Sequence, residues 1–295
     1  MSLSADTCLL QAGAGRLIVG KSWEHWFLTD VKRAIRDYGM ISSGDRVAVG
    51  VSGGKDSMSL LYVLAYLRDY SHLSFSLRAV YIDAGWGTVD CSPLESFCAA
   101  NGVPLDTVSY PIARIIAEKG EKGACSLCAK LRAGLLNSRA KELGCNRVAL
   151  GHHLDDVIET FFLNLLYAGI MKTFRPAVYL DRIGLHLIRP FSYLPEQRLD
   201  RLVARVNIPV LPPACPYAGR TRREDMKDMV RCITQRYPEF RTRFRSALEN
   251  VSMNDLWRQR RGERSYVVDN SGERINGRVD YDRNHGGSDS GQGDR

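Results

Sequence analysis

The stretch VAVGVSGGKDSMSLLYVL, residues 47–64, joins an apolar β-branched run to an apolar helical run through a turn of Ser, Gly, Lys and Asp. A strand, a glycine turn and a helix bring free backbone N–H groups and the positive end of a helix dipole to one point, which suits phosphate. A Walker A loop does not fit, because Val49 and Asp56 stand where it needs Gly and Ser or Thr, and the three-glycine spacing of a dinucleotide fingerprint is missing. A plain capped turn would explain the glycines but gives no reason for Lys55 beside Asp56.

The rest of the chain alternates strand-type and helix-type segments. Short apolar runs of strand type occupy 45–51, 77–83, 105–110 and 146–151. Helical spacing lies between them, and in 157–169 the apolar pairs recur at steps of four residues: Val157, Phe161, Leu165 and Ile158, Phe162, Leu166. This order predicts an α/β fold with a mostly parallel sheet, helices on both faces and ligands beyond the carboxyl ends of the strands.

Composition places limits on the class of protein. The chain has 295 residues, with 41 Lys and Arg against 33 Asp and Glu, so its net charge of +8 suits a polyanionic partner or an ordinary basic enzyme. No apolar run approaches eighteen residues, and the start of the chain lacks the basic segment of a secretory signal. We therefore expect no membrane partner and a cytoplasmic location.

The SGGKDS turn matches at every position the pyrophosphate loop S-G-G-x-D-S of the ATP pyrophosphatase (PP-loop) superfamily, which it resembles. The resemblance implies an adenine nucleotide alpha hydrolase-like fold and cleavage of ATP between its α- and β-phosphates. It also implies that the β- and γ-phosphates bind to Ser52, Gly53, Gly54, Lys55 and Ser57. Asp56 would help to place Mg²⁺, and Asp83, in YIDAGWG, would contact the adenosine.

A second motif follows the strand-type run RVAL. In GHHLDDVIET, Asp155 and Asp156 stand at the start of a predicted helix, where carboxylates stabilise the helix and can also coordinate a hard cation. Plain N-capping is the weaker alternative for this pair. The motif resembles the family's G-H-x-x-D-D element, which implies a nucleotide site that includes Gly151, His152 and Asp155. Zinc binding by the two histidines is disfavoured because adjacent side chains at a strand end diverge, and the role of His153 stays open.

The cysteines suggest chemistry beyond ATP binding. Eight cysteines in 295 residues are too sparse for a secreted disulfide framework, and only Cys125 and Cys128 form a close pair, with Cys215 standing alone later. Structural zinc normally takes four ligands, and a thioredoxin-like redox pair would leave Cys215 unexplained. Three thiolates suit a [4Fe-4S] cluster with one iron open to an external sulfide.

Longer segments carry a closer resemblance. The segments CSLCAKLRAG, ALGHHLDDVIETFFLNLLYAG, LIRPFSYLPE and RYPEFRTRFRSALENV resemble the tRNA 2-thiolation enzymes of the TtcA/TtuA family, nearest the tRNA 2-thiocytidine synthetase branch, over about 26–257. The resemblance implies Cys125, Cys128 and Cys215 as cluster ligands. The 2-thiocytidine enzymes carry a further cysteine where this chain has Ala218, and the flanking zinc-finger cysteines of the thiouridine branch are missing.

The implied reaction is ATP-dependent thiolation of a tRNA pyrimidine at C2. ATP would adenylate O2, and sulfide held by the cluster would attack C2 and expel AMP. We expect Lys55, Asp56, Asp156 and Arg132 to be catalytic. Arg132 and Lys130 lie one helical turn after the cysteine pair and would stabilise developing charge or grip RNA, although solvated helix charges explain them as well.

The remaining expectations concern organisation and partners. The basic run 219–245 is a candidate tRNA surface, or merely a solvated helix face. A sulfur donor, either a cysteine desulfurase or sulfide, is required, and a homodimer is common in the family. We predict a helical segment at 1–44, a nucleotide and cluster domain at 45–215, a basic helical region at 216–257 and a disordered tail at 258–295, which is rich in Gly, Arg, Asp and Ser.

Two other functions remain open on the sequence alone. A protein of this fold can activate a small molecule for attack by an amine or ammonia, and such a ligase would need no iron. A non-enzymatic nucleotide-binding or RNA-binding protein is the second alternative, although it gives no reason for three thiolates beside an intact pyrophosphate loop.

Overall fold

The computed structural model describes residues 24–87, 89–120, 124–212, 214–216, 222–256, 266–268 and 274–276. By compactness the chain forms two units, Met1–Leu248 and Glu249–Arg295, so the predicted boundaries at 44/45 and 215/216 fall inside the first unit. Of the predicted tail, the described residues are two short antiparallel strands, β7 (Tyr266–Val268) and β8 (Arg274–Asn276), and the rest lies outside the described residues.

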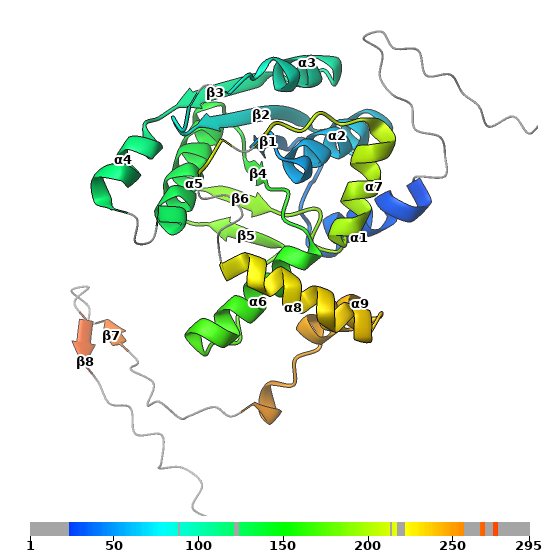
Figure 1. Cartoon of the computed structure of the whole chain (residues 1–295), viewed down its shortest axis with the longest axis vertical. Helices are drawn as coiled ribbons and strands as arrows, with labels where there is room; N and C mark the ends of the chain where they lie inside the picture. The colour runs from blue at the N-terminus through cyan, green and yellow to red at the C-terminus, as the bar shows by residue number, and fades with distance from the viewer. Residues whose placement is uncertain are drawn as a thin grey trace, which may run out of the picture. The chain divides into compact units, whose positions relative to one another are not determined.

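The first unit is built on one six-stranded sheet (Figure 1). The strands are β1 (Arg46–Val51), β2 (Ser76–Asp83), β3 (Leu105–Ser109), β4 (Arg147–Ala149), β5 (Ala177–Leu180) and β6 (Leu185–Ile188). Their order is β3-β2-β1-β4-β6-β5, and every neighbouring pair is parallel except β5 with β6. The predicted mostly parallel sheet is confirmed, and the antiparallel strand at its edge is an addition.

Helices cover both faces of this sheet, as predicted (Figure 1). One core contains η1 (Glu24–Leu28), α1 (Thr29–Asp37), α2 (Lys55–Tyr70), α3 (Ser92–Ala100) and α7 (Glu196–Val206). The opposite core contains α4 (Ile112–Lys119) and α5 (Ala124–Glu142). The nine consecutive residues of α2 from Ser57 to Ala65 lie buried, as does Leu67, so the turn that opens this helix is anchored to the core.

A smaller core lies beyond the sheet. It joins α6 (Leu154–Ala168) to α8 (Arg222–Arg236) and α9 (Phe240–Glu249) through Ile158, Val230 and a group of phenylalanine rings. A short 3-10 turn, η2 (Met253–Asp255), belongs to the second unit. The helices α8 and α9 lie within the region 216–257, and they pack on the helix that follows β4.

The chain reverses its direction across the sheet between β1 and β4. From β1 it moves outward through β2 to β3, and then returns to form β4 on the other side of β1. In open α/β sheets such a switch point leaves a crevice at the carboxyl ends of the two strands, where ligands bind. The SGGKDS turn follows β1 and GHHLDD follows β4, so both motifs reach this one point.

Candidate functional site

The turn after β1 has a conformation that requires glycine. Gly53 has φ +79°, and a Cβ added there would lie 2.7 Å from a methyl group of Leu211. The amide N–H of Leu211 also donates to the carbonyl oxygen of Gly53 at 2.9 Å. Alanine at this position would therefore be strained by both its backbone and its neighbour. The segment that leads to Cys215 is fixed against the turn by these contacts.

Two serine side chains fix the shape of the same turn. The Ser57 hydroxyl donates to the carbonyl oxygen of Gly54 at 2.9 Å and accepts from the backbone N–H of Ser52 at 3.0 Å. The two serine Oγ atoms lie 3.1 Å apart. The turn is held open by its own side chains, which leaves it preorganised for an anion at the amino end of α2.

Gly151 brings the second motif against the first. A Cβ at this position would lie 2.9 Å from the backbone carbon and oxygen of Asp56. Any larger residue would push the end of β4 away from the first turn of α2. The predicted nucleotide residues of the two motifs are therefore adjacent in space.

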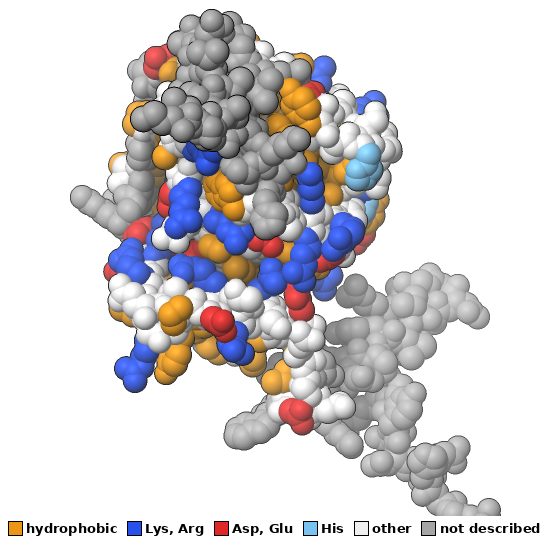
Figure 2. Space-filling view, turned by 90° about the vertical axis from the view of Figure 1, so that its right-hand side faces the viewer, with side chains coloured by type: hydrophobic (Ala, Val, Ile, Leu, Met, Phe, Trp, Pro, Cys, Tyr) orange, Lys and Arg blue, Asp and Glu red, His pale blue; other side chains and the backbone are white. Residues whose placement is uncertain are grey.

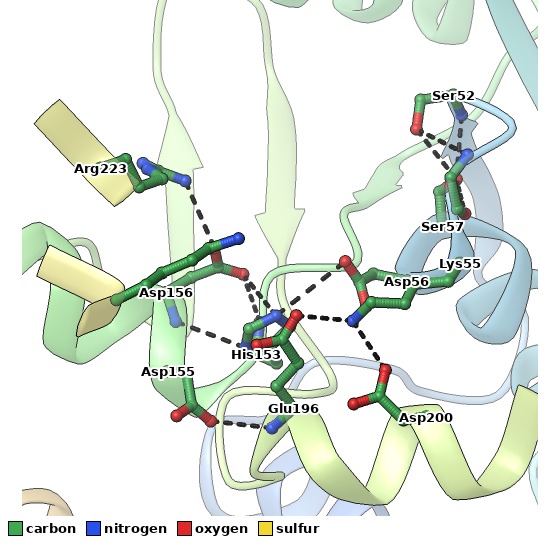
Figure 3. A network of polar contacts seen from close by, with 12 residues as sticks. Ser52, Lys55, Asp56, Ser57, His153, Asp155, Asp156, Glu196, Asp200 and Arg223 are labelled. Carbon is green, nitrogen blue, oxygen red and sulfur yellow. Dashed lines mark hydrogen bonds and ion pairs between the residues drawn. The ribbon is translucent and has the colours of Figure 1, made fainter. Parts of the chain in front are cut away.

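Lys55 is engaged by three carboxylates (Figure 3). Its Nζ lies 2.7 Å from Glu196 and 3.2 Å from Asp200, both on α7, and 3.1 Å from Asp56. Burial opposes the charge of Lys55, but the hydrogen bond to Glu196 and the charges of Asp56 and Glu196 outweigh it and raise its pKa above the ordinary value. The lysine is a fixed cation at the mouth of the turn.

His153 and Asp156 form a reciprocal cap at the start of α6. The backbone N–H of His153 donates to Asp156 Oδ2 at 3.0 Å, and the N–H of Asp156 donates to His153 Nδ1 at 3.4 Å. His153 Nε2 lies 3.4 Å from Asp156 and 3.9 Å from Asp56. Asp156 therefore caps the helix and also faces the phosphate turn, so the capping role and the predicted role at the site are compatible. Arg223 of α8 lies 3.3 Å from its carboxylate (Figure 3).

Asp155 has a structural position beside the site. Its carboxylate accepts the backbone N–H of Glu196 at 2.8 Å and the Nε of Arg241 at 2.6 Å, and the side chain is almost fully buried. It thus fixes the amino end of α7, which carries the partners of Lys55, and ties α9 to the same point.

The other two predicted nucleotide residues lie at either side of the turn. His152 Nδ1 accepts from Arg189 at 3.3 Å, and its ring packs on Phe174 with 5.1 Å between centroids. Burial lowers the pKa of His152 to about 4, so the ring is neutral at pH 7. Asp83 ends β2 and accepts the N–H of Gly85 at 2.9 Å, which shapes the loop after that strand.

The three predicted cluster cysteines interact electrostatically. Burial raises the pKa of the Cys128 thiol, Cys215 and Cys125 raise it further, and Arg132 and a hydrogen bond from Trp86 lower it. Cys125 is exposed, and Cys128 and Cys215 are half-buried. Cys215 follows Leu211 by four residues, so at most about 14 Å of chain separates it from the residue bonded to Gly53. The cysteine group therefore lies at the same edge of the sheet as the phosphate turn.

The two basic residues after the cysteine pair differ in position. Arg132 is half-buried and interacts with Cys128 and with Tyr81 at the end of β2. Lys130 is exposed. The structure thus directs Arg132 toward the cysteines, while the exposure of Lys130 favours a solvated charge.

Within the described part of the chain, no group of three or more His, Cys, Asp and Glu side chains is arranged to hold a metal ion. A cluster distributes its cysteines over several iron atoms, so its ligands are spaced more widely than those of one ion. Zinc binding by the histidines gains no support from this arrangement. No described helix has the length and apolar character that crossing a membrane requires.

Known proteins match the part of the chain that contains these motifs. Residues 25–210 match the PP-loop domain family. The chain belongs to the PP-loop family. A protein of Pelobacter propionicus with the name tRNA-cytidine(32) 2-sulfurtransferase is 37% identical over 230 residues, 77% of this chain and 86% of its own length. A protein of Alkalilimnicola ehrlichii with the same name is 40% identical over 76% of this chain and 72% of its own length.

A solved structure supports the fold of this PP-loop chain. The U34-tRNA thiolase NcsA from Methanococcus maripaludis, described with its [4Fe-4S] cluster, superposes with a TM-score of 0.62 at 20% identity, over 80% of this chain and 85% of its own. The resemblance to the tRNA 2-thiolation enzymes, nearest the 2-thiocytidine branch, is confirmed by the named relatives. Ala218, where this chain departs from the branch, lies outside the described residues.

Four residues of the site have no motif of their own in the sequence. Glu196 and Asp200 contact Lys55, Arg223 contacts Asp156, and Arg241 contacts Asp155. The first pair lies more than 140 positions after the lysine, so local patterns could not reveal the contact. The sequence signals were indirect: LIRPFSYLPE contains Glu196 and RYPEFRTRFRSALENV contains Arg241, both within the resemblance to the thiolation enzymes, and Arg223 lies in the basic run 219–245.

Glu159, one turn after Asp156, gives this PP-loop protein a testable pH dependence. It is 1% exposed, and its Oε2 has no hydrogen-bond partner within the described residues. Burial, with the charge of Asp156, raises the pKa of Glu159 to about 8. Between the ordinary pKa of a glutamate and 8, the folded protein keeps a proton that the unfolded chain releases, so the free energy of unfolding falls as pH rises through this range.

Replacing Glu159 with glutamine removes this titration. The free energy of unfolding of the native protein should fall by about 2 kcal/mol or more between pH 5.5 and pH 8 relative to that of Glu159→Gln. Each pH unit contributes at most ~1.4 kcal/mol to this difference. Urea unfolding at both pH values measures the difference. Glu118→Gln, on an exposed glutamate, is the control and should leave the pH dependence unchanged. Parallel curves for Glu159→Gln and the native protein would contradict the assignment.

Proposed function

We propose that this protein is an ATP-dependent tRNA sulfurtransferase that converts a cytidine to 2-thiocytidine. One observation carries the proposal. Leu211 hydrogen-bonds the phosphate turn, and Cys215, four residues later, interacts electrostatically with Cys128, which also interacts with Cys125. Nucleotide chemistry and three thiols thus converge on one edge of the sheet. An enzyme that activates an oxygen with ATP and replaces it with sulfur needs this combination.

The nucleotide would lie across the switch point between β1 and β4. The backbone N–H groups of the turn from Ser52 to Gly54, the Ser57 hydroxyl and Lys55 suit the β- and γ-phosphates. Asp56 and Asp156 face the same point, and their carboxylate oxygens are suitable ligands for Mg²⁺, which would neutralise phosphate charge. Asp83 and His152 flank the turn at the ends of β2 and β4 and suit contacts to the adenosine.

The donor set fits an iron–sulfur cluster. Cys125 and Cys128 stand near the start of α5, and both Cys125 and Cys215 interact electrostatically with Cys128, which gives three soft ligands for four irons. A [4Fe-4S] cluster held by these residues would supply an iron without a protein ligand, able to carry sulfide. Burial raises the pKa of Cys128, while Arg132 and the Trp86 hydrogen bond oppose this shift and favour the thiolate form that iron requires.

The reaction then proceeds in two balanced steps. O2 of the cytidine attacks the α-phosphorus of ATP, which forms an O2–P bond and releases pyrophosphate. Sulfide then attacks C2, a C–S bond forms, and O2 leaves with the AMP. Lys55 holds the charge that develops on the departing pyrophosphate, and the half-buried Arg132 lies where it can stabilise the adenylate.

The tRNA would bind to the basic helices that adjoin the site. Figure 2 shows Lys and Arg side chains gathered in a broad band on the face that carries α1, α7 and α9. Several cations of α8 and α9 are paired with their own helix, as Arg231 is with Asp228 and Arg243 with Glu239, so these contribute little net charge. A cysteine desulfurase or free sulfide would supply the sulfur, and a tRNA substrate would place the protein in the cytoplasm. A homodimer stays a prediction.

The test uses the full chain purified without oxygen. With ATP, Mg²⁺, sulfide and tRNA from a strain that lacks 2-thiocytidine, nucleoside mass spectrometry should detect 2-thiocytidine, together with AMP and pyrophosphate release that depends on the tRNA. The same protein should contain iron and acid-labile sulfide. A protein without iron that releases AMP with an amine or ammonia acceptor would instead establish the small-molecule ligase. ATP binding without AMP release with any tRNA would support the non-enzymatic alternative.

A further inference from the structure

The carboxyl end of α6 and the loop after it expose large apolar side chains. The exposed fractions are 57% for Leu166, 50% for Tyr167, 51% for Ile170 and 64% for Met171. We call these four residues the α6 tip. The helical spacing of the sequence would place Leu166 on the same buried face as Ile158 and Phe162. The structure shows instead that α8 and α9 cover only the first part of that face.

The loop from the α6 tip is fixed and leads back to the site. Gly169, at φ +62°, ends the helix, and the Asn164 amide then donates to the carbonyl oxygen of Lys172 at 2.9 Å. The Thr173 hydroxyl donates to the carbonyl oxygen of Val157 at 2.8 Å, and Phe174 packs on His152. The loop therefore runs back along α6 from the tip to the side of the predicted nucleotide site.

Two neighbouring arginines of α8 contact the two ends of α6. Arg223 reaches Asp156 at the amino end of α6, whereas the guanidinium of Arg222 lies over the ring of Tyr167, 4.5 Å from its centroid. Asp156 and Tyr167 are eleven residues apart on one helix, or about 16 Å. The side chains of the first two residues of α8 thus reach both Asp156, beside the site, and the exposed ring of Tyr167.

We propose that the α6 tip with Arg222 binds single-stranded nucleotides of the RNA substrate, with one base stacked on the pair formed by Tyr167 and Arg222. Unpaired RNA bases are recognised by stacking on aromatic rings and on guanidinium planes, and apolar neighbours exclude water from the stack. Exposed Lys172 and Arg175 on the returning loop supply charges for the phosphates between this base and the site. The inference rests on the proposed function and adds a binding site to it.

The occupant follows from charge and continuity. A protein partner for a purely apolar patch would not need a cation stacked on its central ring, and the loop after the α6 tip leads back to His152 beside the proposed nucleotide site. RNA satisfies both features, because it is anionic and presents bases on each side of its target. Self-association through Leu166, Ile170 and Met171 is the competing outcome.

The experiment measures the affinity of the full chain for tRNA and for a single-stranded RNA by fluorescence anisotropy. Tyr167→Ala is expected to weaken binding of both about tenfold, Tyr167→Trp to preserve it, and Arg222→Ala to weaken it without adding fully to Tyr167→Ala. Tyr179→Ala is the matched control, because that ring is exposed to a similar extent, 51%, but lies on the edge strand β5. Its affinity should equal that of the native protein.

One outcome would overturn the inference, and another concerns only the proposed function. Native RNA affinity in Tyr167→Ala would overturn it. If that variant also shifted from dimer to monomer in sedimentation velocity, the α6 tip would be assigned to a second copy of the chain. Weakened RNA binding in a protein that never forms 2-thiocytidine would refute the proposed reaction while leaving the stacking site in place.

Discussion

Cys215→Ser is expected to abolish 2-thiocytidine formation and to remove most of the bound iron, while the protein remains folded. Serine has nearly the size of cysteine, but its hydroxyl is a poor ligand for iron at neutral pH, so only two of three cluster ligands would remain. The residue is half-buried and lies outside the two large cores, so loss of its thiol should change the stability little. Iron and sulfide content, the visible absorbance of the cluster and nucleoside analysis measure the effect.

The adenylation half of the reaction should survive this substitution. The loop that carries Cys215 contacts the phosphate turn through backbone and apolar atoms of Leu211, which serine at 215 leaves intact. Exchange of labelled pyrophosphate into ATP in the presence of tRNA should therefore stay within a few-fold of the native rate. Cys232→Ser, on an exposed thiol of α8, is the matched control and should keep both iron and thiolation. Full thiolation by Cys215→Ser would refute the three-ligand cluster.

Much of the site could be predicted because its chemistry is local in the sequence. The SGGKDS turn contains its own ligands within six residues, and the position of Asp156 follows from the first turn of one helix. The alternating pattern also predicted that β1 and β4 end at the same edge. Parallel strands bring motifs about 100 residues apart together by topology alone, so no knowledge of side-chain packing was required.

The missing parts depend on packing between distant elements. Glu196 meets Lys55 only because α7 lies against α2, and Asp155, which accepts the Glu196 N–H, fixes the start of that helix. The periodicity of α6 predicted its apolar face, but it could not show where α8 and α9 stop covering that face. Similarly, β5 and β6 are short strands of four residues joined as an antiparallel pair, and runs of that length give little signal.

Lys55→Ala is expected to reduce kcat/KM for ATP by about 10³-fold in the AMP-forming reaction. The native lysine forms ion pairs with both Glu196 and Asp200 and brings a positive charge to the phosphate turn. Without it, these carboxylates and Asp56 would repel each other and the incoming phosphates, and the departing pyrophosphate would lose its counter-charge. Removal of one preorganised donor to a developing charge typically costs 10² to 10³ in rate, and the repulsion adds to this loss.

Substitution of a carboxylate separates the two causes of this loss, which are the missing contact of the lysine with phosphate and the repulsion by the carboxylates. Glu196→Gln keeps a hydrogen-bond acceptor for Lys55 but removes a negative charge, so it should lower the KM for ATP or leave it unchanged. Combined with Lys55→Ala, it should partly rescue ATP binding. Lys130→Ala, on an exposed lysine of α5, is the control for loss of a positive charge and should retain ATP affinity. If the double variant were no better than Lys55→Ala, repulsion by Glu196 would not contribute, and the lysine would act through its own contact with phosphate alone.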